Sequence, residues 1–415
     1  MPGADRVRRL PGGDAMTSAL KGINVLDLSN VLAGPYCAYQ LALLGAHVLK
    51  IEVPKAGDLA RQLGADAELN ALHMGASFLA QNAGKRSLTI NLKSEDGKEI
   101  LRRLVQTADV LVENFRPGVM ARLGLSYDDL RQHNPKLVYC AISGFGQTGP
   151  LRAAPAYDQI IQGLSGMMSI TGAADSAPLR VGFPVADTLA GMTAAFAIAA
   201  ALVRRLVSGE GAFVDVSMLD TALSSMGWAV SNYLIAGVEP QPHGNDNFTA
   251  APSGAFRAKD GMLNISANKQ EQFEALVQAL GIGALASDPR FADRESRKRN
   301  RAALTEELQR VLETRNCAEW EALFNSIGIP AGAVLTVSQA LDLPQVRHRQ
   351  LLKSLEDVPG VPRPLTVART GFKLSDGDPD VQLPPPGLGQ HTEEILQSIG
   401  YSRADIERLR SAGAI

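Results

Sequence analysis

The sequence predicts an α/β protein in which a large doubly wound parallel sheet is joined to a smaller α+β domain. Short β-rich runs alternate with helical stretches from Ile23 to Ile142, and this alternation builds parallel sheets with helices on both faces. Polar residues follow several of these runs, at Asn30, Asn114 and Ser143. A length of 415 residues is more than one ordinary core needs, so two domains are expected.

Each expected element rests on a local pattern. The strands are expected at residues 23–28, 47–53, 87–92, 109–113 and 137–142, with a sixth at 213–216. A helix is expected from Gly34 to Leu44 because Pro35 suits a first helical turn. Ser94 is expected to cap a helix that runs to Gln106, and Ser126 to cap a short one. The carboxyl ends of the strands should form the ligand-binding edge.

The second half of the chain predicts a change of architecture. A segment dense in Pro, Gly and Asn follows the Ala-rich run, and a hairpin is expected around Asp260-Gly261. We expect residues 1–18 to be a flexible tail, 19–230 the first part of the large domain, 231–253 a linker, 254–335 the small domain, 336–386 a returning linker and 387–415 the last part of the large domain.

Composition excludes several classes of partner. The net charge is −2, with 41 basic and 43 acidic residues interspersed, so neither nucleic acid nor an anionic membrane surface is expected. The longest apolar run, Leu189 to Val203, is too short to span a bilayer and predicts a buried helix. Three cysteines stand far apart in the sequence, at Cys37, Cys140 and Cys317, which favours a reduced, cytoplasmic compartment.

Two stretches of sequence resemble nucleotide-binding motifs, but the residues around them do not fit such a site. The stretch Gly144 to Gly149 matches G-x-G-x-x-G, but Pro150 follows at once, so the loop cannot open a phosphate-binding helix. Lys85-Arg86 lacks the first glycine of a P-loop. This pair is interpreted either as solvated charge or as a phosphate contact. The six histidines show no ligand spacing, and no metal site is expected.

Asp187 is the candidate catalytic residue. It stands one residue before a long apolar run, where the first turn of a helix offers unpaired N–H groups and the positive end of the dipole. One interpretation is plain helix capping. The other is a carboxylate that stays ionised and acts as a nucleophile. Asp158 is a second candidate for carboxylate chemistry.

Several ordered blocks resemble the family III CoA-transferases, also called the CaiB–BaiF family. The resemblance runs from about Leu20 to the C-terminus. It is carried by blocks at 20–28, 31–35, 44–52, 57–61, 82–87, 112–118, 144–150, 157–158, 182–192 and 388–392. It implies an interlocked homodimer and reversible transfer of CoA between an acyl-CoA, such as succinyl-CoA, and a free carboxylic or dicarboxylic acid.

The resemblance also implies a mechanism and a set of site residues. Asp187 attacks the thioester to give a mixed anhydride, CoA thiolate returns to form an aspartyl-CoA thioester, and the acceptor acid completes the exchange. No tightly bound cofactor is implied; CoA is part of the substrate. Tyr157 and Asp158 line the catalytic site. The CoA contacts implied are Val31, Leu32, Ala33, Lys93, Asn114 and Arg122, with Lys85 and Arg86 added as phosphate contacts. The acid is assigned to Arg61, Arg180, Gly244 and Asn245.

Two alternatives stay open. The related α-methylacyl-CoA racemases carry a His-Asp pair where this chain has Tyr157-Asp158, and tyrosine is a poor base at neutral pH. A non-catalytic acyl-CoA-binding protein is the third possibility. Leu32 and Val53 replace a glutamine and an arginine of formyl-CoA transferases, which disfavours formate and oxalate and favours larger dicarboxylates.

Overall fold

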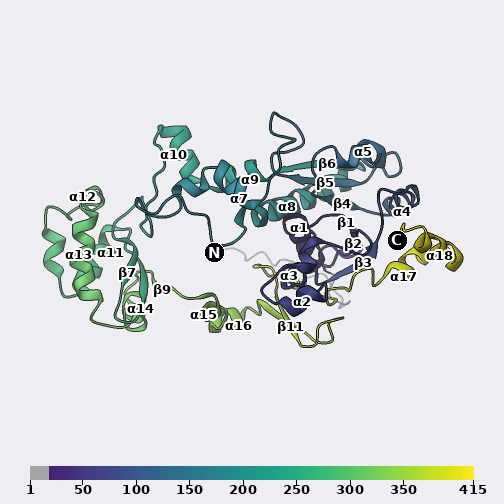
Figure 1. Cartoon of the computed structure of the whole chain (residues 1–415). Helices are drawn as coiled ribbons and strands as arrows, with labels where there is room; N and C mark the ends of the chain where they lie inside the picture. The colour runs from purple at the N-terminus through teal and green to yellow at the C-terminus, as the bar shows by residue number, and fades with distance from the viewer. Residues whose placement is uncertain (1–17) are drawn as a thin grey trace, which may run out of the picture. The chain divides into compact units, whose positions relative to one another are not determined.

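The computed structural model describes residues 18–415, which divide into two compact units. Unit 1 comprises the described residues up to Ser165, together with Gly182–Gly227 and Arg349–Ile415. Unit 2 comprises Gly166–Val181 and Trp228–His348. The expected tail at 1–18 lies outside the described residues except for Ser18. Both ends of the described chain therefore belong to unit 1 (Figure 1).

Unit 1 is built on a parallel sheet, as the alternating runs predict. Its strands are β1 (Asn24–Asp27), β2 (His47–Glu52), β3 (Lys85–Thr89), β4 (Val110–Glu113), β5 (Val138–Ser143) and β6 (Ala212–Ser217). Their spatial order is β3-β2-β1-β4-β5-β6, and every neighbouring pair is parallel. The order reverses at β1, so the switch point where such sheets bind ligands lies between β1 and β4.

Helices and short elements complete unit 1. They are α1 (Ala33–Leu43), the 3-10 helix η1 (Leu59–Gln62), α2 (Ala67–Ala71), α3 (Ala76–Asn82), α4 (Glu95–Val105), α5 (Val119–Arg122), α6 (Tyr127–Leu130), α7 (Asp158–Leu164), α8 (Val185–Ser208), α9 (Met218–Ser225), the hairpin of β10 (Leu352–Leu355) and β11 (Leu365–Ala368), α17 (Thr392–Ser398) and α18 (Arg403–Ser411). The expected caps are confirmed: the side chains of Ser94 and Ser126 accept backbone N–H groups from Gly97 and Asp129.

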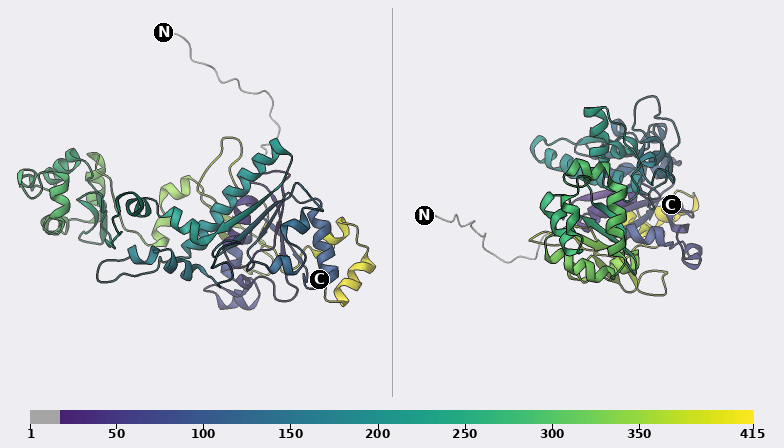
Figure 2. Two further views of the ribbon diagram at one scale, coloured as in Figure 1. Left: turned by 90° about the horizontal axis from the view of Figure 1, so that it is seen from above. Right: turned by 90° about the vertical axis from the view of Figure 1, so that its left-hand side faces the viewer.

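The C-terminal helices help to cover the sheet. Leu396 of α17 and Leu409 of α18 are fully buried in one core with Leu101 of α4 and Leu111 of β4. These helices lie beside α4 in Figures 1 and 2. Helices α17 and α18 each carry apolar residues on one face, at the helical period of 3.6 residues. Burial of these faces explains why the C-terminal segment packs on the sheet of unit 1.

Helix α8 is less buried than the sequence predicts. It is the one helix among residues 18–415 that is long and apolar enough to cross a membrane, with a mean hydropathy of 1.7 over a window that is 33% buried. A core helix of a soluble protein passes the same test. Ala190, Ala194 and Ile198 are buried, but Phe196 is 76% and Val207 91% exposed. The prediction of a buried helix is therefore wrong for the outer face.

Unit 2 has its own core and a different architecture. Its sheet, in the order β7-β8-β9, is antiparallel and contains β7 (Ser253–Arg257), β8 (Met262–Ser266) and β9 (Ala331–Ala333). Its helical elements are η2 (Met167–Ile170), α10 (Trp228–Ala236), α11 (Gln270–Ala279), η3 (Gly283–Ser287), α12 (Arg294–Arg299), α13 (Arg301–Leu312), α14 (Cys317–Ser326), α15 (Val337–Leu341) and α16 (Pro344–His348). Phe273, Leu308 and Trp320 pack together in the core. The hairpin expected around Asp260-Gly261 is confirmed.

Candidate active site

The start of α8 is capped by Asp158 and not by Asp187. Asp187 is the third residue of α8, and its side chain makes no capping hydrogen bond. Asp158, the first residue of α7, accepts the N–H of Ala186 at 2.8 Å through Oδ1 and the side-chain N–H of Gln162 at 2.7 Å through Oδ2. The interpretation of Asp187 as a plain cap is therefore wrong, because another helix supplies the acceptor that the helix start requires.

The Asp187 carboxylate has an unusual charge environment. The residue is partly buried, and among residues 18–415 its carboxylate makes no hydrogen bond or ion pair. Burial, followed by the nearby charge of Asp158, raises the pKa of Asp187 to about 7. We expected the unpaired N–H groups and the helix dipole at this position to keep the carboxylate ionised. That expectation is wrong, because desolvation and like charge outweigh a dipole effect of about 1 kcal/mol.

A glycine brings helix α8 close to α1. A Cβ added at Gly191 would lie 2.6 Å from the carbonyl oxygen of Ala33 and 3.1 Å from the ring of Tyr36. Only glycine permits this approach. Asp187 stands four residues before Gly191, one turn away on the same helix face. The N–H groups of Ala33 and Gly34 at the start of α1 make no hydrogen bond to any described residue.

The loop before α1 spans the switch point of the sheet. The side chain of Asn114, just after β4, accepts the N–H of Asn30 at 2.8 Å and donates to its carbonyl at 2.8 Å. Val31 follows with a positive φ of 68°, which is rare for a β-branched residue. Asn114 thus fixes the loop that carries the predicted CoA contacts Val31, Leu32 and Ala33.

A large cleft opens at the same edge of unit 1. It has a volume of about 1080 Å³. It is lined at the strand ends by Asn30, Val53 and Phe115 and at its rim by the cations Lys55, Lys93 and Arg410. Lys93 is exposed and lines this cleft; its contact with CoA stays a prediction. Asp187 does not line this cleft; the loop from Asn30 to Ala33 connects the two.

Two predicted ligand cations are buried in ion pairs. Lys85 is fully buried and bonds to Asp27 at 2.8 Å and to the carbonyl of Pro35 at 2.9 Å. Arg61 is also fully buried and forms a bidentate ion pair with Glu52, with hydrogen bonds of 2.7 and 2.8 Å. The prediction of a phosphate contact for Lys85 and of an acid contact for Arg61 is wrong, because neither group reaches solvent.

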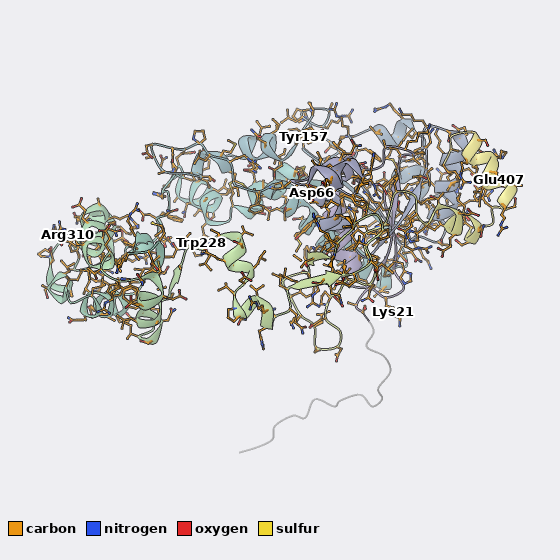
Figure 3. The ribbon with its side chains drawn as sticks, turned by 60° about the horizontal axis from the view of Figure 1, so that its bottom comes forward. Lys21, Asp66, Tyr157, Trp228, Arg310 and Glu407 are labelled. Carbon is orange, nitrogen blue, oxygen red and sulfur yellow. The ribbon has the colours of Figure 1, made fainter. Side chains whose placement is uncertain are left out.

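The remaining predicted residues of unit 1 lie at its surface. Arg86 is partly exposed and pairs with Glu394 of α17 at 2.6 Å, a surface ion pair of small net stability. Arg122, the last residue of α5, is exposed. Tyr157 precedes α7 and is 70% exposed (Figure 3).

The predicted acid contacts other than Arg61 belong to unit 2. Arg180 is exposed. Gly244 and Asn245 form an exposed turn in which Gly244 has φ 59° and donates its N–H to the carbonyl of Gly172 at 2.7 Å. This turn is a local feature of unit 2.

Sequence reasoning missed two residues that hold Val31. Asp58 Oδ1 accepts the N–H of Val31 at 2.9 Å, and Gln81 donates to the Val31 carbonyl at 2.6 Å. Asp58 also accepts the N–H of Ala60, and an aspartate placed two residues before that N–H is the pattern that could have indicated it. Within residues 18–415, no group of three or more His, Cys, Asp or Glu side chains could hold a metal ion.

Comparison with known proteins assigns a family to this site. The profile described as CoA-transferase family III matches residues 20–392. A succinate–glutarate CoA-transferase of Agrobacterium fabrum is 37% identical, over 92% of this chain and 95% of that protein. An acetyl-CoA:oxalate CoA-transferase of Acetobacter aceti is 41% identical, over 80% of this chain and 84% of that protein.

Solved structures agree with the sequence comparison. The crystal structure of a CAIB/BAIF family protein from Brucella suis superposes with a TM-score of 0.81 at 36% identity, covering 92% of this chain and 100% of that one. The resemblance inferred from the ordered motif blocks is therefore confirmed. The chain belongs to CoA-transferase family III, and it is an enzyme that transfers CoA between an acyl-CoA and an acid.

Proposed function

We propose that the enzyme exchanges CoA between succinyl-CoA and a dicarboxylic acid, with Asp187 as the covalent nucleophile. The observation that carries this proposal is the Asp187 carboxylate itself. It is partly exposed, has no partner among the described residues, and stands one turn before Gly191, where α8 meets the start of α1. A carboxylate that served only structure would be paired or would cap its helix.

The reaction balances without a redox step. The ionised carboxylate of Asp187 attacks the thioester carbonyl, the C–S bond breaks, and CoA leaves as a thiolate. The thiolate then attacks the carbonyl carbon of the aspartyl anhydride and releases the donor acid. The acceptor carboxylate attacks the resulting aspartyl thioester, and a last return of the thiolate yields the new acyl-CoA. Each step exchanges one carboxylate or thiolate for another.

The proposed acids follow from the relatives. The Agrobacterium protein acts by its name on succinate and glutarate, and the Acetobacter protein on oxalate. Dicarboxylates are therefore the acceptors to test, and oxalate belongs in the panel even though Leu32 departs from the formyl-CoA transferase pattern. We propose Arg180 as the cation for a second carboxylate, since Arg61 is buried against Glu52, and Gly244-Asn245 as part of the loop that contacts the acid.

We also propose that the enzyme works as a homodimer in the cytoplasm. The outer face of α8 carries Phe196, Val203 and Val207, which recur at helical spacing. Their side chains are 76%, 64% and 91% exposed, respectively. An apolar stripe of this kind marks an association surface. Val207→Glu should weaken a dimer measured by light scattering. Three cysteines that are free and buried suit a reducing compartment.

An exchange assay tests the function. Purified enzyme is mixed with succinyl-CoA and each of a panel of carboxylates, and new acyl-CoA is separated by chromatography. Asp187→Ala should abolish exchange. Asp220→Ala, which removes the first-turn aspartate of α9 in the same unit, should retain it. Full exchange by Asp187→Ala would refute the mechanism. Deuterium entering the α-carbon of a 2-methylacyl-CoA without an acceptor acid would support the racemase alternative instead.

A further inference from the structure

Val31 has a backbone conformation that its side chain disfavours. Five non-glycine residues among residues 18–415 have a positive φ, and Val31 is the only β-branched one of them. In the left-handed region a β-branched side chain crowds its own backbone. Such a residue persists only where its surroundings impose the conformation. The contacts made by the Val31 backbone should therefore show what imposes it.

Two buried side chains bind the backbone N–H and the backbone carbonyl of Val31. Asp58 Oδ1 accepts the N–H at 2.9 Å, and Gln81 Nε2 donates to the carbonyl at 2.6 Å. Asp58 is completely buried and Gln81 is 3% exposed. They come from the start of η1 and from α3, two elements remote in sequence from the loop. The N–H and the carbonyl of Val31 are thus oriented independently of its own φ preference.

Asp58 is itself fixed by alternate residues of β2. Its Oδ2 pairs with Lys50 Nζ at 2.9 Å, and its backbone N–H donates to Glu52 Oε1 at 3.0 Å. Lys50 also donates to the carbonyl of Ser29, two residues before Val31. A buried ion pair of this kind contributes little net stability compared with apolar packing. Its geometry, however, leaves Asp58 a single position.

The two bonds from Asp58 and Gln81 to Val31 are called the clamp below. The clamp lies directly before the point where α8 contacts α1. Ala33 begins α1 two residues after Val31, and the carbonyl of Ala33 is the atom that Gly191 of α8 approaches. Asp187 is one turn from Gly191 on the same face. A change of φ at Val31 would therefore move the start of α1 relative to the Asp187 carboxylate.

We infer that Asp58, together with Gln81, is a positioning residue for acyl transfer, because it holds Val31 in the left-handed conformation and so sets the start of α1 against Asp187. This inference rests on the proposed role of Asp187. Neither residue touches the reacting atoms. A displacement of about 1 Å at a reacting centre can cost about 100-fold in rate, so the loss expected from releasing the clamp is about 10- to 100-fold.

A single-turnover experiment separates positioning from folding. Wild-type enzyme is mixed with succinyl-CoA, and hydroxylamine traps the acylated aspartate at successive times. The amplitude of trapping counts folded, competent sites, and the rate constant reports the geometry of attack. Asp58→Asn should lower the rate constant about 10- to 100-fold and keep most of the amplitude. Asp66→Asn is the matched control, because Asp66 is a partly exposed aspartate that caps α2 through two backbone N–H groups and makes no bond to Val31.

A Val31→Gly substitution, which removes the steric penalty at this φ, supplies a second and independent test of the clamp. Glycine adopts a φ of 68° without a steric penalty, so Val31→Gly should make the clamp less necessary. Asp58→Asn should therefore slow the reaction less in a Val31→Gly background than in the wild type. Gln81→Met should show the same coupling, and it keeps the test open if Asp58→Asn does not fold.

Two outcomes overturn the inference. One is a wild-type rate constant per trapped site in both Asp58→Asn and Gln81→Met. The other is an equal loss with and without Val31→Gly, which would mean that the clamp does not act through Val31. If wild-type enzyme itself gives no trapped adduct, it is the proposed role of Asp187 that fails, and the two failures are thereby distinguished.

Discussion

Replacing Asp187 by asparagine should stabilise the fold at neutral pH, and the gain should depend on pH. Asp187 has a pKa of about 7 in the folded protein against an ordinary value of 3.8. Because the folded pKa is the higher one, the wild type loses stability as the pH rises from about 4 to about 7, and the loss is complete above that window. Asp187→Asn has no proton to lose and escapes this penalty.

The magnitude follows from the two pKa values. A gap of about 3 pH units corresponds to a ceiling of about 4 kcal/mol, at about 1.4 kcal/mol per unit. Solvent reaches this partly exposed carboxylate and lowers the figure. Between pH 5 and pH 8 we therefore expect the advantage of Asp187→Asn over wild type to grow by about 1 to 3 kcal/mol. Comparing two pH values removes the fixed cost of placing an amide in the site.

Urea unfolding followed by far-ultraviolet circular dichroism measures this difference. The two tryptophans, Trp228 and Trp320, both belong to unit 2, so tryptophan fluorescence would follow the unit that lacks Asp187. Asp220→Asn in α9 should show no growing advantage, since that side chain is exposed. A gap between Asp187→Asn and wild type that is the same at both pH values, within about 0.5 kcal/mol, would refute the reasoning.

Three further predictions concern the same surroundings. The kcat/KM for acyl-CoA should rise with pH through about 7 as Asp187 ionises, and Asp158→Asn should move that rise to lower pH because it removes a neighbouring negative charge; a pH–rate profile of both enzymes decides this. Arg61→Ala should lower the free energy of unfolding by about 3 to 5 kcal/mol, because the buried carboxylate of Glu52 loses its ion-pair partner, while the KM for the acid stays unchanged; a raised KM would restore Arg61 as a substrate contact. Gly191→Ala should cost about 1 to 3 kcal/mol and slow exchange, because the added methyl group meets a carbonyl of α1; unfolding and exchange at wild-type values would contradict the close approach.

The parallel sheet was predictable because its strands and helix caps are encoded by residues that are neighbours in the sequence. Alternating β-rich and helical runs predicted all six strands of the parallel sheet within a few residues, and serines at helix starts predicted caps that the structure contains. Helix α8 was harder to predict. It is apolar nearly all round, so its sequence does not distinguish the face on α1 from the face that carries Phe196 and Val207.

The candidate site was only partly predictable because its charges depend on contacts remote in sequence. A solvated lysine and Lys85 look alike in a sequence, and the partner that buries Lys85 is Asp27, 58 residues away. The pKa of Asp187 likewise depends on the burial of α8 and on Asp158 from another helix. Motif blocks drew attention to Asp187, but spacing alone could not show that a different carboxylate caps its helix.

The most direct test of the account is the mass of one peptide. Trypsin releases residues 181–204 between Arg180 and Arg204, and Asp187 is the only side-chain carboxylate in that peptide. Enzyme that turns over succinyl-CoA in the presence of hydroxylamine should yield this peptide as its hydroxamate, and Asp187→Asn should yield it unmodified. A wild-type peptide that stays unmodified while exchange proceeds would contradict covalent catalysis by Asp187.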